Sequence, residues 1–370
     1  MSADLPVNLV DSPFAKELNS LFSEILPEVV YENNKQSLKK EASSLSKQMT
    51  SFLLKAYNLN IFLGKVFSMA IDAGAEKIRE AIEKALQKRE GALIGRNGTI
   101  ELETLFFRLY ESSPNQQYPH HITRSIELHA GIWPPDKFNL DKWVFQMVEA
   151  IRLCDVLVAG WYEPLKDKEE KLLQKTNNLA PRIPLRSLEP YYVDPETRWT
   201  HLLAGQRVAV VSSFAETIQE QLDKTEKIWP GEFESLLPSN VEWVPIRTGY
   251  APVLAKGIAG WPPKITSWDV ALDFVVKRVI ESQASIAIIG CGGLGMLIGA
   301  ELKKRGVIAI VLGGATQVLF GIKGQRWSNH SVISKFWNDA WVWPKPTETP
   351  SGASLIEGSC YWAPANVINI

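Results

Sequence analysis

The residues best suited to chemistry lie in residues 285–314, SIAIIGCGGLGMLIGAELKKRGVIAIVLGG. Gly290, Gly292 and Gly295 have GxGxxG spacing between an expected strand and an expected helix. Such glycines allow a tight turn and a close backbone approach to a phosphate, and the N-terminus of the following helix offers unpaired N–H groups. The stretch predicts a strand, loop and helix that handle a nucleotide. The alternative is that the glycines only let the strand and the helix pack closely.

The end of the second strand in this stretch argues against NAD. A dinucleotide site normally has Asp or Glu there to bind the ribose hydroxyls. Here the expected strand 307–312 runs into Gly313 and Gly314, so we expect no NAD. Cys291 has no histidine nearby in the sequence to activate it, and we expect a small packed residue there.

Two cations follow the glycine loop. Residues 317–327, QVLFGIKGQRW, place Lys323 and Arg326 on a loop expected beside the carboxyl edge of the sheet. A lysine point charge and an arginine fork are the usual means of neutralising a diphosphate. The sequence therefore predicts that both bind phosphate, and ordinary surface exposure is the alternative.

A second candidate site lies in residues 92–105, ALIGRNGTIELETL, where a strand is followed by a turn and a helix. Arg96 and the backbone N–H groups of the turn could bind an anion, with Glu101 facing a metal or a sugar hydroxyl. Simple capping explains the pattern equally well, because Thr99 suits an N-cap and carboxylates are favoured in the first turn of a helix.

These motifs require a fold that brings the ends of several strands together. After Arg89, short apolar runs alternate with amphipathic helices, which is typical of a parallel sheet covered by helices. The expected strands are 92–95, 156–161, 207–212, 241–246, 285–289 and 307–312. The expected helices are 101–110, 141–153, 215–227, 268–281 and 294–305. The fold class predicted is α/β, with a Rossmann-like, mostly parallel sheet flanked by helices.

The chain is expected to consist of a helical N-terminal extension, residues 1–90, and a Rossmann-like domain, residues 91–370. Apolar residues recur at helical spacing from Ile71 to Ala85, opposite a charged face. We expect the extension to pack on the sheet or to mediate oligomerisation. The charged, proline-bearing segment at about 163–200 is expected to be a surface insertion or a connection between two lobes.

Composition excludes several classes of partner. The 370 residues include 40 basic and 41 acidic side chains, so no net field favours nucleic acid or an anionic membrane. Three distant cysteines argue against a disulfide framework and against a CxxC metal site, which indicates a reducing compartment. The N-terminus lacks the pattern of a secretory signal, and residues 52–73 contain too many polar groups for a transmembrane segment. We therefore expect a cytoplasmic protein.

Five short segments, in order, resemble the glycosyltransferases of the GT-D fold. They are GRNGTIE at 95–101, SSFAETIQEQ at 212–221, GCGGLG at 290–295, GGATQVLFGIKGQRW at 313–327 and EGSCYW at 357–362. The resemblance extends over about 92–362 and leaves the first 90 residues uncovered. It implies an enzyme that transfers a sugar from a nucleotide-sugar donor, expected to be UDP-linked, to a glycan or glycoprotein acceptor.

The resemblance also implies roles for particular residues. The family commonly holds a divalent metal, Mn²⁺ or Mg²⁺, near a DxE motif after the first strand. Glu101 matches the Glu of that motif and is expected to be catalytic and to bind metal, whereas Thr99 stands where the Asp would be. Asp155 is the candidate for the missing carboxylate or a base, with a turn residue between helix and strand as its alternative role. The expected nucleotide-sugar-binding residues are Gly95, Arg96, Asn97, Gly98, Thr99, Gly290, Gly292, Gly295, Gln317, Lys323 and Arg326.

Three alternatives stay open at the level of sequence. The first is a metal-free transfer in which Arg96, Lys323 or Arg326 carries the charge. The second is an NAD(P)-dependent oxidoreductase that uses the GxGxxG loop, and the third is a non-catalytic nucleotide-binding module. The tryptophans concentrated near the C-terminus could line an acceptor groove or pack in the core.

Overall fold

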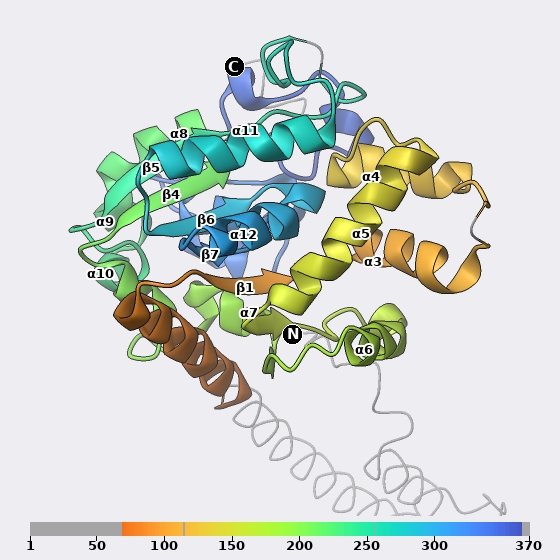
Figure 1. Ribbon diagram of the computed structural model, residues 1–370. Coiled ribbons are helices and arrows are strands. Elements are labelled where there is room, and N and C mark those ends of the chain that lie inside the picture. The colour runs from red at the N-terminus through yellow and green to blue at the C-terminus, as the bar shows by residue number, and fades with distance from the viewer. Residues whose placement is uncertain (1–68, 114, 256, 365–370) are drawn as a thin grey trace, which may run out of the picture. The chain divides into compact units, whose positions relative to one another are not determined.

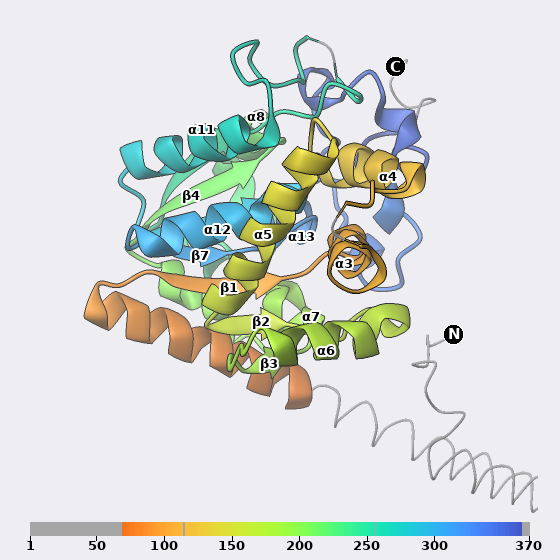
Figure 2. The ribbon, with the colours of Figure 1, turned by 45° about the vertical axis from the view of Figure 1, so that its right-hand side comes forward.

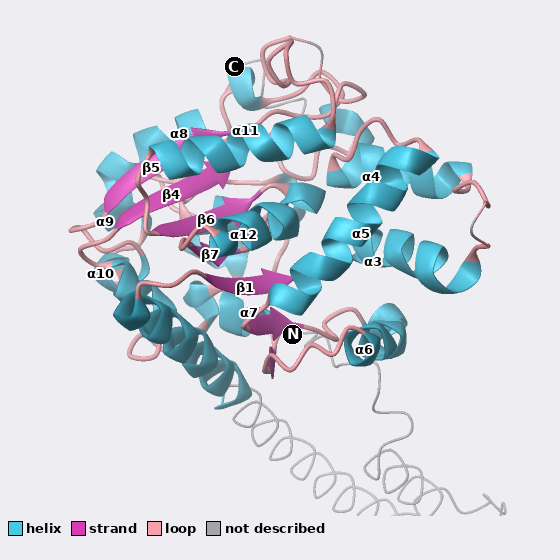
Figure 3. Ribbon diagram, viewed as in Figure 1, coloured by secondary structure: helices cyan, strands magenta, loops and turns pink. Residues whose placement is uncertain are grey.

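The computed structural model describes residues 69–364 except 114 and 256. These residues form a seven-stranded parallel sheet in the order β3-β2-β1-β7-β6-β4-β5, with helices on both faces (Figures 1 and 3). The predicted Rossmann-like α/β fold is confirmed. The strands are β1 (Ala92–Arg96), β2 (Val156–Val158), β3 (Arg182–Ile183), β4 (Arg207–Ser212), β5 (Glu242–Arg247), β6 (Ile286–Gly290) and β7 (Ile308–Ile310).

The central strands are buried on both faces, which explains their continuous apolar runs. Successive residues face opposite cores, as Leu93 and Ile94 of β1 do. One core lies under α3 (Thr99–Phe106), α4 (His120–Ala130), α5 (Lys137–Leu153), α11 (Trp268–Glu281) and α12 (Gly295–Lys304). The other lies under the helix over 69–88, α8 (Ala215–Gln221) and α13 (Ala315–Leu319). Figures 1 and 2 show α5, α11 and α12 together on one face of the sheet.

Six of the seven strands lie where the sequence predicts strands, and α11 has the predicted bounds. The expected helix 101–110 is α3 followed by a π-helix, Phe107–Glu111. The expected helix 215–227 is shorter, because α8 gives way to a 3-10 helix and α9 (Thr225–Ile228). A short helix, α10 (Phe233–Leu236), precedes β5. The segment 163–200 contributes α6 (Lys166–Lys175), α7 (Leu185–Leu188) and the edge strand β3, and it therefore completes one edge of the sheet.

The sheet and its helices belong to one compact unit, Ala70–Ile370. The helix over 69–88 belongs to the sheet's unit, because its Ile78, Ile82 and Ala85 are buried in the core, although the sequence analysis assigns it to the extension. The rest of that extension, with its predicted role in oligomerisation, lies outside the described residues. None of the helices in the described part of the chain has the length and hydrophobicity to span a bilayer.

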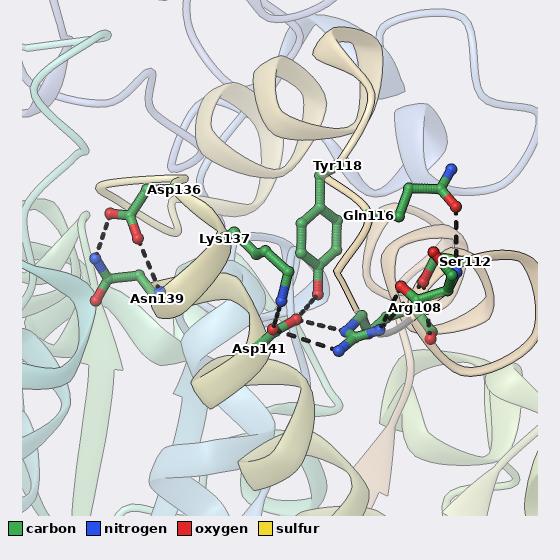
Figure 4. Close-up of polar contacts among 9 residues, drawn as sticks. Arg108, Ser112, Gln116, Tyr118, Asp136, Lys137, Asn139 and Asp141 are labelled. Atoms are coloured by element: carbon green, nitrogen blue, oxygen red, sulfur yellow. Dashed lines mark hydrogen bonds and ion pairs between the residues drawn. The ribbon is translucent and has the colours of Figure 1, made fainter.

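Asp141 on α5 joins three segments outside the sheet. It accepts hydrogen bonds from Arg108 Nε at 2.6 Å, from Tyr118 Oη at 2.8 Å and from Lys137 Nζ (Figure 4). Arg108 belongs to the π-helix and Tyr118 precedes α4. The network therefore fixes the chain between α3 and α5.

A buried carboxylate on α6 joins the turns that follow β1 and β2. Glu169 is 2% exposed, and its two oxygens accept hydrogen bonds from Asn97 Nδ2 and from the Gly160 N–H, each at 2.8 Å. The indole N–H of Trp161 donates to the Asn97 carbonyl at 3.0 Å. Burial raises the pKa of Glu169, and the two hydrogen bonds oppose that shift. Asn97 therefore holds the turn that presents its neighbour Arg96.

Replacing Glu169 with Ala is expected to lower the free energy of unfolding by about 2–3 kcal/mol. The change removes two hydrogen bonds to a charged acceptor and leaves the buried Asn97 amide unpaired. Glu170→Ala is the matched control on the same helix, because the Glu170 side chain is 46% exposed and makes only exposed contacts, with Arg182 Nε at 3.5 Å and Gln174 Nε2 at 3.2 Å. It should cost less than about 1 kcal/mol. Urea unfolding measures both, and equal losses would contradict this role of Glu169.

Candidate functional site

At the carboxyl edge of the sheet, neighbouring strands send their helices to opposite faces. α3 and α12, which follow β1 and β6, pack in one core, whereas α8 and α13, which follow β4 and β7, pack in the other. Chains that leave a sheet toward opposite faces open a crevice between them, and α/β proteins bind ligands there. The topology therefore predicts a binding site beside β7 and β6.

A cleft of about 310 Å³ lies at this position. It is lined by the ends of β1, β4, β6 and β7, by the end of α4 and by parts of the segments 248–261 and 356–362. Eight residues predicted for the site line it: Arg96, Gly98, Thr99, Glu101, Gly290, Gly292, Gln317 and Arg326. The fold thus brings together motifs separated by more than half of the chain.

Four other predicted residues do not line the cleft, namely Gly95, Asn97, Gly295 and Lys323. Gly95 and Gly295 are packing positions, since a Cβ would lie 2.7 Å from Cys154 Sγ at the first and 3.0 Å from Val311 at the second. Asn97 donates a hydrogen bond to the buried Glu169 carboxylate and so has a structural role. Lys323 Nζ lies over the Trp337 ring, 5.7 Å from its centroid.

Asp155 lies at the opposite, amino edge of the sheet. Its Oδ2 accepts hydrogen bonds from the Leu93 N–H at 2.8 Å and from Lys303 Nζ at 2.7 Å. These bonds tie the start of β2 to β1 and to the last turn of α12. The structure therefore gives Asp155 the structural role kept as its alternative, and we leave it out of the site.

Arg96 is a half-buried cation at the end of β1. Its guanidinium lies over the Trp161 ring, 5.3 Å from the centroid, and its Nη1 is 3.2 Å from the position that a Cβ on Gly313 would take. No group among the described residues accepts a hydrogen bond from this guanidinium. Five N–H donors without an acceptor favour an anion at this place.

Arg326 lies beside Gly314, the glycine that follows Gly313. Its Nη1 is 3.9 Å from the Cβ position of Gly314 and donates to Tyr361 Oη at 2.6 Å, while Nη2 is 3.7 Å from a Glu357 carboxylate oxygen. The Glu357 side chain is 62% exposed, so water weakens this ion pair. Arg96 and Arg326 therefore flank a backbone segment that has no side chains of its own.

The segment beside Arg326 is strained. Glu357, Gly358 and Ser359 have consecutive positive φ angles of 42°, 64° and 72°. Residues with a Cβ adopt this region at an energetic cost, and such costs concentrate at functional sites. The segment brings Glu357 and Tyr361 to the cleft wall.

Glu101, in the first turn of α3, is 9% exposed and lines the cleft. A Cβ on Gly98 would overlap with its carboxylate, so the glycine lets this side chain fold back. Burial raises the pKa of Glu101, and its own backbone N–H and the charge of Arg96 oppose that shift. A carboxyl group with a raised pKa in a cleft is suited to proton transfer.

The groups around Glu101 do not fit a divalent metal. Thr99 supplies only a hydroxyl, and Arg96 already places positive charge beside the carboxylate. Within residues 69–364, apart from the two omitted, no three His, Cys, Asp or Glu side chains lie together as metal ligands. Mg²⁺ and Mn²⁺ depend on carboxylate and other oxygen ligands, and Glu101 supplies the only carboxylate in the segment 95–101.

The N-terminus of α8 faces the same edge, but a carboxylate of the protein already caps it. Glu348, 1% exposed, accepts hydrogen bonds from the backbone N–H groups of Glu216 at 2.7 Å and Thr217 at 3.2 Å. These N–H groups are therefore used within the fold. The Arg96 guanidinium, by contrast, donates to no group among the described residues and keeps its N–H donors available for a ligand's anion.

Several cleft residues could not be assigned from the sequence. Aromatic rings come from Trp161, Tyr250, Trp261 and Tyr361, and His129 comes from the end of α4. Trp362, one of the C-terminal tryptophans considered for an acceptor groove, also lines the cleft. Tyr361 and Trp362 belong to the EGSCYW segment, and Ser212 and Ser213 begin SSFAETIQEQ. The resemblance to GT-D glycosyltransferases therefore included both segments but implied no role for these side chains. Nothing in the sequence marks Trp161, because its position depends on the bond to Asn97.

Comparisons with protein-family profiles, with curated proteins and with solved structures found no match to this chain. A functional conclusion therefore depends on the geometry of the cleft and on the resemblance of its motifs.

A second carboxyl group, Glu189, interacts electrostatically with Arg96, and its pKa allows this interaction to be tested by varying the pH. Burial raises the pKa of Glu189 from 4.5 to about 7, while the charges of Arg96 and Arg186 oppose the shift. Between these two values the folded protein holds a proton that the unfolded chain does not. The contribution of Glu189 to the free energy of unfolding therefore falls as the pH rises through this window.

Glu189→Gln is expected to be more stable than the parent at about pH 8, with the difference shrinking toward about pH 5. Above pH 7 the parent should also bind inorganic pyrophosphate more weakly than the variant, because ionised Glu189 offsets the charge of Arg96. Thermal unfolding and titration calorimetry across this range measure the two effects. Glu196→Gln, at an exposed position, is the control, and a matching pH profile in both variants would contradict the assignment.

Proposed function

We propose that this protein is a glycosyltransferase that takes a sugar from a nucleotide-sugar donor, expected to be UDP-linked, and passes it to a hydroxyl group of a glycan or glycoprotein. The observation that carries the proposal is Arg96, a half-buried guanidinium without an acceptor, beside a glycine pair at the carboxyl edge of the sheet. A nucleoside diphosphate is an anion that such a group binds well. The five motifs that resemble GT-D glycosyltransferases support the same chemistry.

In the proposed reaction, the bond between the sugar C1 and the phosphate oxygen breaks, and its electron pair leaves with the nucleoside diphosphate. Arg96 and Arg326 stabilise the negative charge that develops there. The acceptor oxygen bonds to C1, and its proton passes to the Glu101 carboxylate. A raised pKa makes that carboxylate a better base near neutral pH.

An NAD(P)-dependent oxidoreductase would use the same crevice, but the end of β7 lacks the acidic side chain that binds the ribose of the dinucleotide. A dinucleotide enzyme binds ribose through an acidic side chain after the second strand, where this chain has Gly313 and Gly314 against two arginines. Glu101 favours an enzyme over a module that only binds nucleotide, because its carboxyl group lines the cleft and has a raised pKa.

Arg96→Met is expected to bind UDP about 10- to 100-fold more weakly than the parent, because it removes charged hydrogen bonds to the diphosphate. Arg96→Lys should fall between them, since an ammonium lacks the planar fork. Arg182→Met, on the edge strand β3 outside the cleft, should bind as the parent does. Titration calorimetry measures the affinities.

Thermal shifts with UDP, GDP and NAD, each with and without Mn²⁺, establish the class of ligand, since a ligand that binds the folded state raises its melting temperature. A shift with UDP or GDP that does not need Mn²⁺ is expected. Stabilisation by NAD alone would contradict the proposed function.

Glu101→Gln is expected to reduce turnover at least about 100-fold, because the amide cannot take the acceptor proton. Its melting temperature and its affinity for UDP should stay close to those of the parent. Glu103→Gln, an exposed position on the same helix, is the matched control. Release of UDP from UDP-glucose and UDP-N-acetylglucosamine, with water as acceptor, measures turnover. Equal rates in both variants would remove Glu101 from the mechanism.

A further inference from the structure

Two oxygens at the start of α13 lack hydrogen-bond partners. Thr316 and Gln317 are 1% and 2% exposed, and both residues line the cleft. Thr316 Oγ1 and Gln317 Oε1 are buried, and neither has a partner among the residues that the structure describes. Buried polar atoms are nearly always paired, and each unpaired one costs about 1–3 kcal/mol. Two such atoms on adjacent cleft residues indicate that a ligand supplies the missing partners.

The orientation of the Gln317 amide is fixed by the backbone. Its Nε2 donates to the Lys323 carbonyl at 2.7 Å and to the Tyr361 carbonyl at 2.8 Å. Both partners can only accept, so turning the amide round would lose both bonds. Oε1 is left to face the remaining side, and the ligand group that meets it must be a hydrogen-bond donor.

Thr316 faces the glycine loop. Its Oγ1 lies 2.9 Å from the position that a Cβ on Gly290 would take, and Gly290 also lines the cleft. A side chain on Gly290 would clash with this hydroxyl and with the Gly313 carbonyl oxygen, which also lies 2.9 Å from that position, so the glycine lets the loop approach Thr316 closely. That hydroxyl can both donate and accept, and neither Thr316 nor Gln317 carries charge. The pair therefore suits a neutral group rather than a phosphate.

We infer that Thr316 and Gln317 form a subsite for the hydroxyl groups of a sugar ring bonded to the diphosphate. The inference rests on the proposed function. Gly313 and Gly314, against which Arg96 and Arg326 lie, precede Thr316 in the chain with only Ala315 between. The ring next to the phosphates is therefore the part of the donor that reaches these side chains. One ring hydroxyl donates to Gln317 Oε1, and a second exchanges a hydrogen bond with Thr316 Oγ1.

A nucleotide sugar carries such a ring on each side of its diphosphate, the ribose and the transferred sugar. The test uses Thr316→Val, which keeps the branched shape and removes the hydroxyl. Thr104→Val is the matched control, because Thr104 is also 1% exposed but donates to the Ile100 carbonyl at 3.0 Å within α3 and does not line the cleft. Titration calorimetry follows UDP, 2′-deoxy-UDP, UDP-glucose and inorganic pyrophosphate.

Thr316→Val is expected to bind the ring-bearing ligand about 3- to 10-fold more weakly than the parent, and pyrophosphate equally well. If the subsite holds the ribose, the parent prefers UDP to 2′-deoxy-UDP and the variant loses that preference. If it holds the transferred sugar, the parent prefers UDP-glucose to UDP and the variant loses that preference instead. Thr104→Val should keep every preference of the parent.

Stability separates a binding role from a structural one. Thr316→Val should unfold at the same temperature as the parent or higher, since it removes an unpaired hydroxyl, whereas Thr104→Val should unfold lower. Gln317→Met extends the test, with only the ratio between ring-bearing ligands and pyrophosphate compared, because it also loses two backbone bonds. Unchanged affinities in Thr316→Val, or weaker pyrophosphate binding, would overturn this inference alone. A parent that binds no diphosphate would overturn it together with the proposed function.

Discussion

The constraint on which the cleft depends is a guanidinium held half-buried without an acceptor. An arginine in this position gives up part of its hydration and gains only the face of Trp161 and the distant charges of Glu101 and Glu189 in return. The surrounding structure keeps it there: the Asn97 carbonyl holds Trp161, and Gly313 offers no side chain in its place. An anion that binds beside Arg96 would receive hydrogen bonds that the fold leaves unused.

The sheet places these unused groups on one side of the same crevice. β1 ends at Arg96, β6 at Gly290, and β7 leads through the glycine pair to Thr316 and Gln317. Because the three strands are neighbours, groups from distant parts of the sequence converge without long loops. Unpaired donors and acceptors fixed before a ligand arrives need no reorganisation when charge develops, which is the main source of electrostatic catalysis. Glu169 and Asp141 hold the connecting segments through hydrogen bonds to buried or partly buried carboxylates.

The fold could be predicted because buried parallel strands appear as apolar, β-branched runs, as in 207–212 and 286–290. β3 could not, since two residues of a charged segment become a strand only by pairing with β2. In the cleft, Arg96 and Glu101 were recognisable because Arg96 ends a strand and Glu101 lies in the first turn of the helix that follows it. Gly95 and Gly295 resemble ligand glycines because tight packing and close approach to a phosphate both exclude a Cβ. Asp155 precedes its strand, so it lies at the amino edge of the sheet, opposite the cleft.

A crystal structure of the full chain with UDP in the presence of EDTA would show whether Arg96 binds the diphosphate. The diphosphate is expected over Gly313 and Gly314, with the Arg96 guanidinium donating to one of its phosphates and no metal between them. UDP bound elsewhere on the protein, or a diphosphate in the cleft that makes no contact with Arg96, would contradict this expectation.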